Sequence, residues 1–572
     1  MSLGLLEELP VRRTKATRSP LLLGDEAVAL AAIHAGVGVA YAYPGTPSTE
    51  ILETLQAHAD EQGITAHWCA NEKTAYEQAL GASMTGVRAL VSMKHVGLNV
   101  AMDPFVNSAL VSIHGGLVVV VADDPGMHSS QNEQDSRVLA DFARIPCLEP
   151  ATQQEAYDMT RAAFELSERF AVPVMVRLVT RVCHGRAEVI TAPVEERRAP
   201  RRFDDGPDWT LLPANGRRLW EVLLDAQPKI AAWTASSPWV SAQLPDGRAP
   251  LGVVTTGIAR NYLEEVLPDL KAPLPHVHVG AYPPPAELLR DLAGRVDRIV
   301  VLEEGYPFLE TRLRGMLGAP VPIEGKESGH VTRAGELTPE TVRRALGLPL
   351  NEELSSSLVL PQRPPQLCQG CPHRDTFTAV RKAITELGAV DRVEGAWDTP
   401  LVAGDIGCYT LGALPPYGAL DSCVCMGASI GMAKGSSDAG AGPTLAVIGD
   451  STFLHSGLTG LVDAASHDTD MTILIPDNGT VAMTGQQPTA LPNTRLVPIL
   501  RGLGVAEEHV HVVEVHPRRT DELAMLIRRE MEHRGLSVIV AVRSCIEAVR
   551  KEKKERRGGE SKAGSAQDGG NR

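Results

Sequence analysis

Short apolar runs alternate with alanine-rich stretches along most of the chain. Between Leu21 and Leu178 the runs that predict strands are Val39–Tyr43, Ala89–Met93, Leu117–Ala122 and Val172–Leu178. Residues 116–122 include four consecutive valines, which is typical of a strand buried on both faces of a sheet. Strands that alternate with helices build parallel sheets. We therefore expect an α/β fold in which parallel sheets are flanked by helices.

The same alternation continues in two further units, which are separated by linkers. Leu251–Thr255, His276–Val279 and Ile299–Glu303 are expected as short parallel strands of the second unit. The linkers are rich in proline, with arginine and aspartate in the first and serine in the second. The predicted segments, in chain order, are an N-terminal extension (1–19), a first domain (20–192), a linker (193–210), a second domain (211–350), a linker (351–366), a third domain (367–548) and a charged, disordered tail (549–572).

Composition limits the classes of function. The chain has 572 residues, too many for one core, with 43% hydrophobic and 22% charged residues. Its net charge of −15 argues against nucleic acid as a partner. No apolar stretch approaches the roughly 20 residues that span a bilayer, and the N-terminus has no apolar core of a signal peptide. We expect a cytoplasmic protein that binds neither nucleic acid nor membrane.

Two oxygen ligands follow neighbouring strands of the third domain. The predicted strand Thr444–Ile448 leads into Gly449 and Asp450, and Met471–Ile475 leads towards Asn478. In a βαβ unit both strand ends open at the same edge of the sheet, so Asp450 and Asn478 should lie side by side. Mg²⁺ suits such a site, because it takes few protein oxygens and adds phosphate and water. Each half alone would indicate only a turn; together they predict a magnesium–diphosphate site.

The nine cysteines do not indicate a disulfide scaffold in a chain of this length. Cys368 and Cys371 form a C-x₂-C pair in a proline-flanked loop, which suits two thiolates on one metal centre. Zinc, or thiols without any metal, are the alternatives to an iron–sulfur centre.

These motifs resemble those of thiamine-diphosphate enzymes. Gly449-Asp450-Ser451 with Asn478 resembles the Gly-Asp-Gly…Asn motif of that fold, with serine in place of the second glycine. Met426-Gly427 resembles the segment that holds the cofactor's aminopyrimidine. The resemblance implies a multidomain thiamine-diphosphate-binding fold with Mg²⁺ bound by the Asp450 and Asn478 side chains and the Thr480 carbonyl. The residues expected to bind the cofactor or its ion are Glu72, Met426, Gly427, Gly449, Asp450, Ser451, Asn478 and Thr480.

The first domain resembles the pyrimidine-binding domain of 2-oxo-acid:ferredoxin oxidoreductases. Glu72 opens an alanine-rich helix that is followed by a strand and then by Lys-His-Val-Gly, in the order of that domain. The likeness implies that Glu72 is the acid that protonates the cofactor's ring. Without it, Glu72 would be only an acidic residue favouring a helix N-terminus. Thr46, in a Tyr-Pro-Gly-Thr-Pro-Ser turn, is the expected substrate-side hydroxyl, and His95, His128 and His455 are expected near the substrate.

Six short sequence motifs resemble, more specifically, motifs of the large subunit of indolepyruvate:ferredoxin oxidoreductases. They are found at 43–48, 93–101, 123–135, 370–374, 404–412 and 482–488. The likeness extends over 20–548 and makes the second domain transketolase C-terminal-like. It implies oxidation of an aryl pyruvate with coenzyme A to an aryl-acetyl-coenzyme A, CO₂ and two low-potential electrons.

The resemblance also implies a 4Fe–4S cluster on Cys368, Cys371, Cys408 and Cys545. The remaining cysteines are expected in the core, namely Cys69, Cys147, Cys183, Cys423 and Cys425. Many relatives continue into a ferredoxin-like domain with further cysteines, whereas this sequence ends in a charged tail without cysteine. We therefore expect electrons to leave through another polypeptide or an external acceptor. A small (beta) subunit is the expected partner, in a dimer of heterodimers.

Two other functions would share part of these residues. A non-oxidative thiamine-dependent 2-oxo acid decarboxylase or carboligase would need Asp450, Asn478 and Glu72 but no cluster. A non-catalytic partner subunit would have lost the use of its thiamine site.

Overall fold

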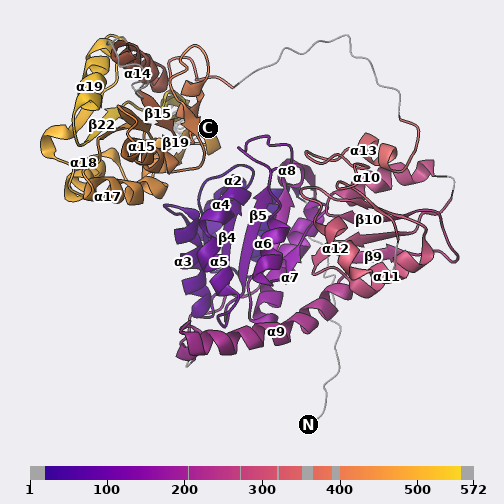
Figure 1. Cartoon of the computed structure of the whole chain (residues 1–572). Coiled ribbons are helices and arrows are strands. Elements are labelled where there is room, and N and C mark those ends of the chain that lie inside the picture. Colours follow the sequence, from indigo (N-terminus) through magenta and orange to yellow (C-terminus); the bar gives the residue numbers. More distant parts are fainter. Residues whose placement is uncertain are drawn as a thin grey trace, which may run out of the picture. The chain divides into compact units, whose positions relative to one another are not determined.

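The computed structural model describes residues 20–203, 205–270, 272–317, 321–350, 365–388 and 400–554 (Figure 1). The chain divides into two compact units, unit 1 up to Ser355 and unit 2 from Ser356. The predicted extension (1–19), most of the second linker (351–364) and the end of the tail (555–572) lie outside the described residues.

Unit 1 contains a seven-stranded sheet with the order β12-β6-β7-β5-β4-β2-β3, parallel except for the short β12. Its strands are β2 (Val39–Ala42), β3 (Thr65–Trp68), β4 (Ala89–Lys94), β5 (Leu117–Asp123), β6 (Cys147–Leu148), β7 (Val174–Val179) and β12 (Ala281–Tyr282). Because successive side chains of a strand point to opposite faces, Val118 and Val120 pack on one face and Val119 and Val121 on the other.

Helices cover both faces of this sheet. On one face lie α1 (Gly24–His34), α2 (Thr49–Gln62) and α7 (Gln153–Phe170). On the other lie α3 (Glu72–Met84), α5 (Met102–Ser108) and α6 (Ser136–Ala143). The short helices α4 (His95–Val100) and α8 (Thr180–His184) begin at the carboxyl ends of β4 and β7. Both faces are apolar, which is why the strands read as continuous apolar runs.

A second, five-stranded sheet completes unit 1, with the order β14-β13-β10-β11-β9. Its strands are β9 (Val240–Gln243), β10 (Gly252–Thr256), β11 (His276–Val279), β13 (Ile299–Leu302) and β14 (Ile323–Glu324), and only β9 is antiparallel. Its helices are α10 (Ala259–Val266), α11 (Ala286–Arg295), α12 (Phe308–Met316) and α13 (Pro339–Ala345). The long helix α9 (Pro213–Ala235) precedes this sheet (Figure 1).

The two sheets of unit 1 share their hydrophobic cores. Residues of the first sheet and of β10, β11 and β13 belong to the same two clusters of buried side chains. Strand β12, which follows β11 in the chain, pairs with β6 of the first sheet. The predicted domains 20–192 and 211–350 therefore each contain a sheet but pack as one compact unit.

A buried ionic cluster lies where the two sheets meet. Arg177 on β7 donates to Asp123 at 2.7 Å and also bonds Glu149. Arg137 on α6 donates to Thr256 of the second sheet at 3.1 Å and to Tyr282 of β12 at 3.0 Å. Both arginines are fully buried. Two buried guanidinium groups thus join elements on both sides of the junction.

Unit 2 contains one sheet of parallel strands with the order β16-β15-β17-β18-β22-β21. The strands are β15 (Leu401–Gly404), β16 (Ser422–Cys423), β17 (Thr444–Val447), β18 (Met471–Asp477), β21 (Val510–Glu514) and β22 (Leu536–Val542). Helices α14 (Pro372–Gly388) and α19 (Thr520–Glu532) cover one face, and α15 (Ala428–Asp438), α17 (Leu458–Ser466) and α18 (Leu496–Gly502) the other. The predicted α/β fold with parallel sheets is confirmed.

Two details of the C-terminal region and the helices complete the fold. Residues 546–554 are helical, so the first described residues of the predicted disordered tail are ordered instead. Their Glu and Lys residues favour helix, and the partly buried Ile546, Ala548 and Val549 add apolar side chains at its start. None of the described helices combines the length and apolarity needed to cross a membrane.

The ionic cluster makes a prediction for stability. Replacing Arg177 by Met leaves Asp123 buried without a counterion and takes away one of the two guanidinium groups beside Glu149, and this should lower the free energy of unfolding of unit 1 by about 3–5 kcal/mol. The control is Arg248→Met, because Arg248 pairs with Asp297 in solvent and its loss should cost less than about 1 kcal/mol. Urea denaturation of both variants measures the difference; equal stabilities would contradict a central role for Arg177.

Candidate active site

Asp450 and Asn478 lie side by side at the carboxyl edge of the unit 2 sheet. Asp450 is the first residue of α16 (Asp450–Thr452), three residues after the end of β17, and Asn478 follows β18. The backbone amide of Gly479 donates to Asp450 Oδ2 at 3.1 Å, and the amide of Thr480 donates to Asn478 Oδ1 at 3.0 Å. The first of these bonds joins the two loops. The Asp450 and Asn478 side chains both lie at the carboxyl edge of the sheet.

A second carboxylate, Asp477, adds to this pair and was missed in the sequence. Its Oδ2 is buried and has no hydrogen-bond partner among the described residues. Burial and the neighbouring Asp477 carboxylate together raise the pKa of Asp450 to about 7. Two buried carboxylates facing each other require a proton or a cation. An oxygen-rich site of this kind fits Mg²⁺. The sequence signal that could have indicated Asp477 is its position directly before Asn478 at the end of a buried strand.

The Met426-Gly427 turn is fixed at the same edge by another missed residue, Asp405. This carboxylate follows β15 and accepts hydrogen bonds from the backbone amides of Gly427 at 2.8 Å and Ser429 at 3.1 Å. Gly427 has φ of +88°, and a Cβ there would lie 2.4 Å from Cβ of Ser456. Only glycine therefore fits this turn without displacing its neighbours.

His455 lies in a π-helical turn, Phe453–Gly457, that follows α16. Its ring is buried, and Nδ1 lies 2.6 Å from Oγ of Ser456, the residue against which Gly427 packs. π-helical turns are frequent at functional sites because they redirect side chains. The structure thus brings His455 close to the Met-Gly turn.

The thiols of Cys368, Cys371, Cys408 and Cys545 interact with one another. Burial raises the pKa of Cys408 to about 12, and the other three thiols add to the shift. Among the described residues, no three of these thiols lie mutually within 4.8 Å. In a tetrahedral zinc site with Zn–S bonds of about 2.3 Å, the sulfurs would lie about 3.8 Å apart. No three of the described thiols are therefore already as close together as a tetrahedral zinc site would hold them.

The segments that carry these cysteines contact the magnesium motif. The backbone amide of Cys545 donates to the Asn478 carbonyl at 3.1 Å. His373, two residues after Cys371, places Nε2 3.2 Å from Nδ2 of Asn478. Tyr409, directly after Cys408, packs against Gly449, where a Cβ would lie 2.5 Å from its ring. The segments that carry Cys371, Cys408 and Cys545 therefore all contact either Gly449 or Asn478.

Two cysteines were assigned to the core incorrectly. Cys423 and Cys425 are exposed, whereas Cys69, Cys147 and Cys183 are buried as expected. Strand β16 has only two residues and lies at the edge of its sheet, so the loop that follows it reaches solvent.

In unit 1, Glu72 is the first residue of α3, after Asn71, whose Oδ1 accepts from the amide of Thr74 at 2.8 Å. The Glu72 side chain is buried, with 6% of the residue exposed. Its carboxylate packs on Gly97, where an added Cβ would lie 2.5 Å from Oε1. The glycine after Lys-His-Val therefore makes the space that this buried acid occupies.

Lys94, at the end of β4, is a missed residue beside the turn that contains Thr46. Its Nζ donates to the Ser129 carbonyl at 2.7 Å, and Oγ of Ser129 donates to the Thr46 carbonyl at 3.1 Å. Burial lowers the pKa of Lys94 to about 8. Among the described residues no carboxylate forms an ion pair with this ammonium, although the Asp124 charge raises the pKa of Lys94 against the effect of burial, and 9% of the residue is exposed. A buried cation without a direct counterion can bind an anion.

The remaining two histidines of unit 1 lie in different surroundings. His95 is fully buried, and its Nε2 is 3.2 Å from the Asn132 carbonyl, in the loop that also carries Ser129. His128 is half-exposed and pairs instead with Glu336 at 3.2 Å. The structure thus associates His95, but not His128, with the buried polar groups around Lys94.

Comparison with known proteins identifies the family. Residues 30–209 match the family model "Pyruvate flavodoxin/ferredoxin oxidoreductase, thiamine diP-bdg", and residues 405–541 match "Thiamine pyrophosphate enzyme, C-terminal TPP binding domain". The indolepyruvate oxidoreductase subunit IorA of Archaeoglobus fulgidus is 37% identical over 555 residues, covering 92% of this chain and 86% of the relative. The IorA subunit of Pyrococcus abyssi is 38% identical over 569 residues, covering 92% and 85%. The chain belongs to the IorA family of indolepyruvate oxidoreductase large subunits.

The IorA family resemblance that the sequence motifs indicated is thereby confirmed, and the protein is a thiamine-diphosphate-dependent 2-oxo-acid oxidoreductase subunit. A 2-oxoglutarate synthase subunit KorA from Methanothermobacter thermautotrophicus is 29% identical over 204 residues, 34% of this chain and 54% of that one. A solved 2-oxoglutarate:ferredoxin oxidoreductase from Magnetococcus marinus has 16% identity and a TM-score of 0.48, covering 58% of this chain and 65% of that chain.

The Met-Gly turn of this IorA family member gives a second prediction. Gly427→Ala should destabilise unit 2 by about 1–3 kcal/mol, because its Cβ would collide with Ser456, and should weaken thiamine diphosphate binding. Gly431→Ala is the control, since a Cβ there meets open space on α15 and should stabilise the helix by about 0.5–1 kcal/mol. Calorimetric titration with the cofactor and thermal unfolding measure both effects. Wild-type cofactor affinity in Gly427→Ala would exclude a role of the turn in binding.

Proposed function

We propose that this protein catalyses the oxidative decarboxylation of an aryl pyruvate of the indolepyruvate type with coenzyme A. The products would be an aryl-acetyl-coenzyme A, CO₂ and two electrons, which pass to a 4Fe–4S cluster. The observation that carries the proposal is the contact between the cysteine segments and the magnesium motif through Asn478 and Gly449. A thiol set placed directly beside a thiamine site suits an oxidative reaction, whereas a non-oxidative decarboxylase has no use for it.

The diphosphate end of the cofactor would be held through Mg²⁺. We assign its protein ligands to the Asp450 and Asn478 side chains and the Thr480 carbonyl, and Asp477 supplies additional negative charge. Gly449 and Ser451 place backbone amides at the start of α16, where a phosphate is favoured. Bound thiamine diphosphate supplies the electron sink that decarboxylation needs.

Glu72 would hold the proton that the cofactor's pyrimidine ring requires. Its side chain is buried, with 6% of the residue exposed, and packs on Gly97, which keeps water away from the carboxyl. We assign Thr46, His95 and His455 to the surroundings of the substrate as hydrogen-bonding groups. His95 is a buried polar side chain at the end of β4, and His455 is a buried one in the π-helical turn close to the Met-Gly turn.

We assign the cluster to Cys368, Cys371, Cys408 and Cys545. The mutual influence of these thiols supports one shared centre, and no three of the described thiols are already as close together as a tetrahedral zinc site would hold them. The relatives are named as subunits, so we propose a small (beta) partner subunit, assembly as a dimer of heterodimers in the cytoplasm, and an external electron acceptor.

The test of the function is anaerobic turnover of indolepyruvate and phenylpyruvate with coenzyme A and a viologen dye, using this chain with its companion subunit. We expect dye reduction that depends on coenzyme A. Glu72→Gln should lower kcat by about 10²–10⁴-fold, the loss typical of a removed general acid, while cofactor affinity stays at the wild-type value. Decarboxylation without dye reduction would establish the non-oxidative alternative instead.

The cluster assignment predicts about four irons per chain and a broad thiolate-to-iron absorption in anaerobically purified protein. Cys371→Ser should abolish both signals, because this buried thiol lies within the set. Cys423→Ser, at an exposed thiol outside the set, should retain them. Stoichiometric zinc in place of iron would refute the cluster.

Lys94 is our candidate for binding the carboxylate of the 2-oxo acid. Lys94→Met should raise KM for the substrate by about 10- to 100-fold, since a hydrogen bond to a charged group contributes about 1.5–3 kcal/mol. In the wild type, KM should rise as the pH increases through about 8, where the ammonium loses its proton. Lys229→Met, at an exposed position, is the control. An unchanged KM in Lys94→Met would show that Lys94 does not bind the substrate carboxylate and that its role is the hydrogen bond to Ser129.

A further inference from the structure

A second group of possible metal ligands lies in unit 1, apart from the thiamine and cysteine residues. Asp25 and Glu50 lie in the first turns of α1 and α2, and His184 is the last residue of α8. One carboxylate oxygen from each acid and one ring nitrogen of the histidine lie within 4.8 Å of one another. Three helix ends thus bring two acids and an imidazole to one place.

The acids of this group have hydrogen-bonding capacity that the protein does not use. Asp25 is fully buried, and neither of its carboxylate oxygens has a hydrogen-bond partner among the described residues. Oε2 of Glu50 is likewise buried without such a partner. The Cys183 thiol beside Asp25 is only a weak donor. Burial and the facing Glu50 charge raise the pKa of Asp25 well above its ordinary value, so the pair requires a positive charge or a proton.

The distance to the histidine fits a shared ion better than a hydrogen bond. Oε2 of Glu50 and Nε2 of His184 are 3.8 Å apart, beyond hydrogen-bond range. Two ligands that each bind one ion at about 2.1 Å are separated by at most about 4.2 Å. The side chains of His184 and Glu50 are each 38% exposed, which leaves a path from solvent to the buried Asp25 carboxylate.

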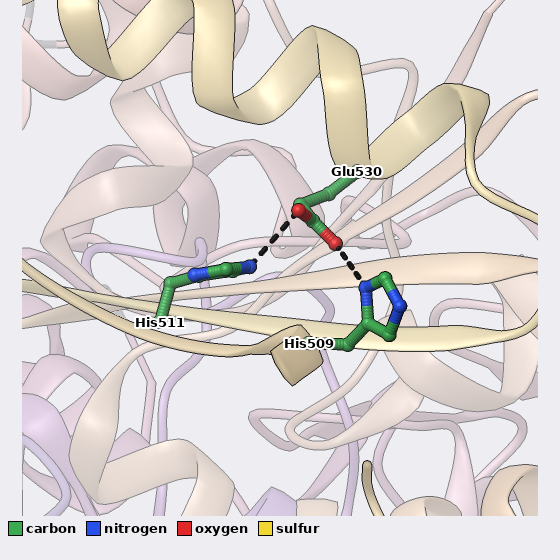
Figure 2. A group of neighbouring side chains, drawn as sticks. All are labelled: His509, His511 and Glu530. Carbon is green, nitrogen blue, oxygen red and sulfur yellow. Dashed lines mark hydrogen bonds and ion pairs between the residues drawn. The ribbon is translucent and has the colours of Figure 1, made fainter. Parts of the chain in front are cut away.

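A second group of histidines and an acid among the described residues shows how such side chains look when no ion is needed. In Figure 2, Glu530 on α19 lies between His509 and His511. Its two oxygens lie 2.7 Å from Nδ1 of His509 and 2.9 Å from Nε2 of His511, and Arg529 donates to it at 2.8 Å. Its hydrogen bonds and the arginine charge satisfy this buried acid, and they anchor the edge strand β21 to α19.

We propose that Asp25, Glu50 and His184 bind a divalent metal ion of the Mn²⁺ or Zn²⁺ type. Two carboxylates and one imidazole suit these ions, which accept both oxygen and nitrogen ligands, better than they suit Mg²⁺. The ion would neutralise the buried acids and fix the starts of α1 and α2 to the end of α8. Because α2 follows the turn that contains Thr46, the ion would also stabilise that turn. This site does not depend on the proposed function.

The experiment uses the full chain with its companion subunit, loaded with thiamine diphosphate and held in excess Mg²⁺ to occupy the diphosphate site. Mn²⁺ is the probe, since it avoids thiolates and its free concentration is read by electron paramagnetic resonance. We expect the wild type and His511→Ala to bind one Mn²⁺ with equal affinity. Asp25→Asn and His184→Ala should bind it at least about tenfold more weakly, the loss expected for a removed ligand.

A thermal shift separates the metal from its chief alternative, one proton shared by two carboxyls. With a metal site, Mn²⁺ raises the Tm of the wild type but not that of Asp25→Asn. With a shared proton, Mn²⁺ leaves the wild-type Tm unchanged, and this result overturns the proposal. Asn can donate to Glu50 in place of the proton, so Asp25→Asn is expected to fold. Loss of Mn²⁺ binding in His511→Ala, with retention in His184→Ala, would also overturn it by placing the ion at the group in Figure 2.

Discussion

The carboxyl ends of neighbouring parallel strands meet at one edge of a sheet, and the chemistry of unit 2 depends on this constraint. Asp405, Asp450, Asn478 and Cys545 follow β15, β17, β18 and β22, four strands that are adjacent in the sheet. These residues come together without a long loop folding over the sheet. The hydrogen bonds between the strands, which fix the strands, also fix the positions of their ends. Unit 1 repeats the arrangement, with Lys94 at the end of β4 and the Thr46 turn after the neighbouring β2.

Placing so many charged groups at buried strand ends creates a second constraint, because each needs compensation. Asp405 is compensated by two backbone amides, and Arg177 by buried carboxylates. Asp450 and Asp477 both accept from the single Gly479 amide and lie next to each other, which is why their site calls for a cation. Uncompensated buried charge is costly, so the groups that the protein leaves unpaired indicate where ions or substrates bind.

Much of this could be predicted from the sequence, because the pattern of one βαβ unit is local. The proximity of Asp450 and Asn478 can be predicted from two apolar runs and the residues that directly follow them. Glu72 could be found only through resemblance, since an acid at a helix start is common and its contact with Gly97 is not visible in a pattern. Lys94 was missed because burial of a lysine cannot be read from its neighbours. The shared cores of the two sheets in unit 1 were missed because alternation shows that a face is buried, but not against what.

The contact between the cysteine segments and the magnesium motif has a mechanical consequence. The Asn478 carbonyl accepts from the Cys545 amide, while the Asn478 side chain meets His373 of the other cysteine segment and its Oδ1 accepts from Thr480. Asn478, itself a proposed metal ligand, therefore contacts both of the proposed cluster loops. Burial lowers the pKa of His373 to about 4, so its ring stays neutral and can accept from the Asn478 amide at physiological pH. In the proposed arrangement, a change of geometry at the thiols would reach the proposed magnesium site through Asn478. The proposed cluster and the diphosphate site would then be two parts of one rigid edge rather than independent sites.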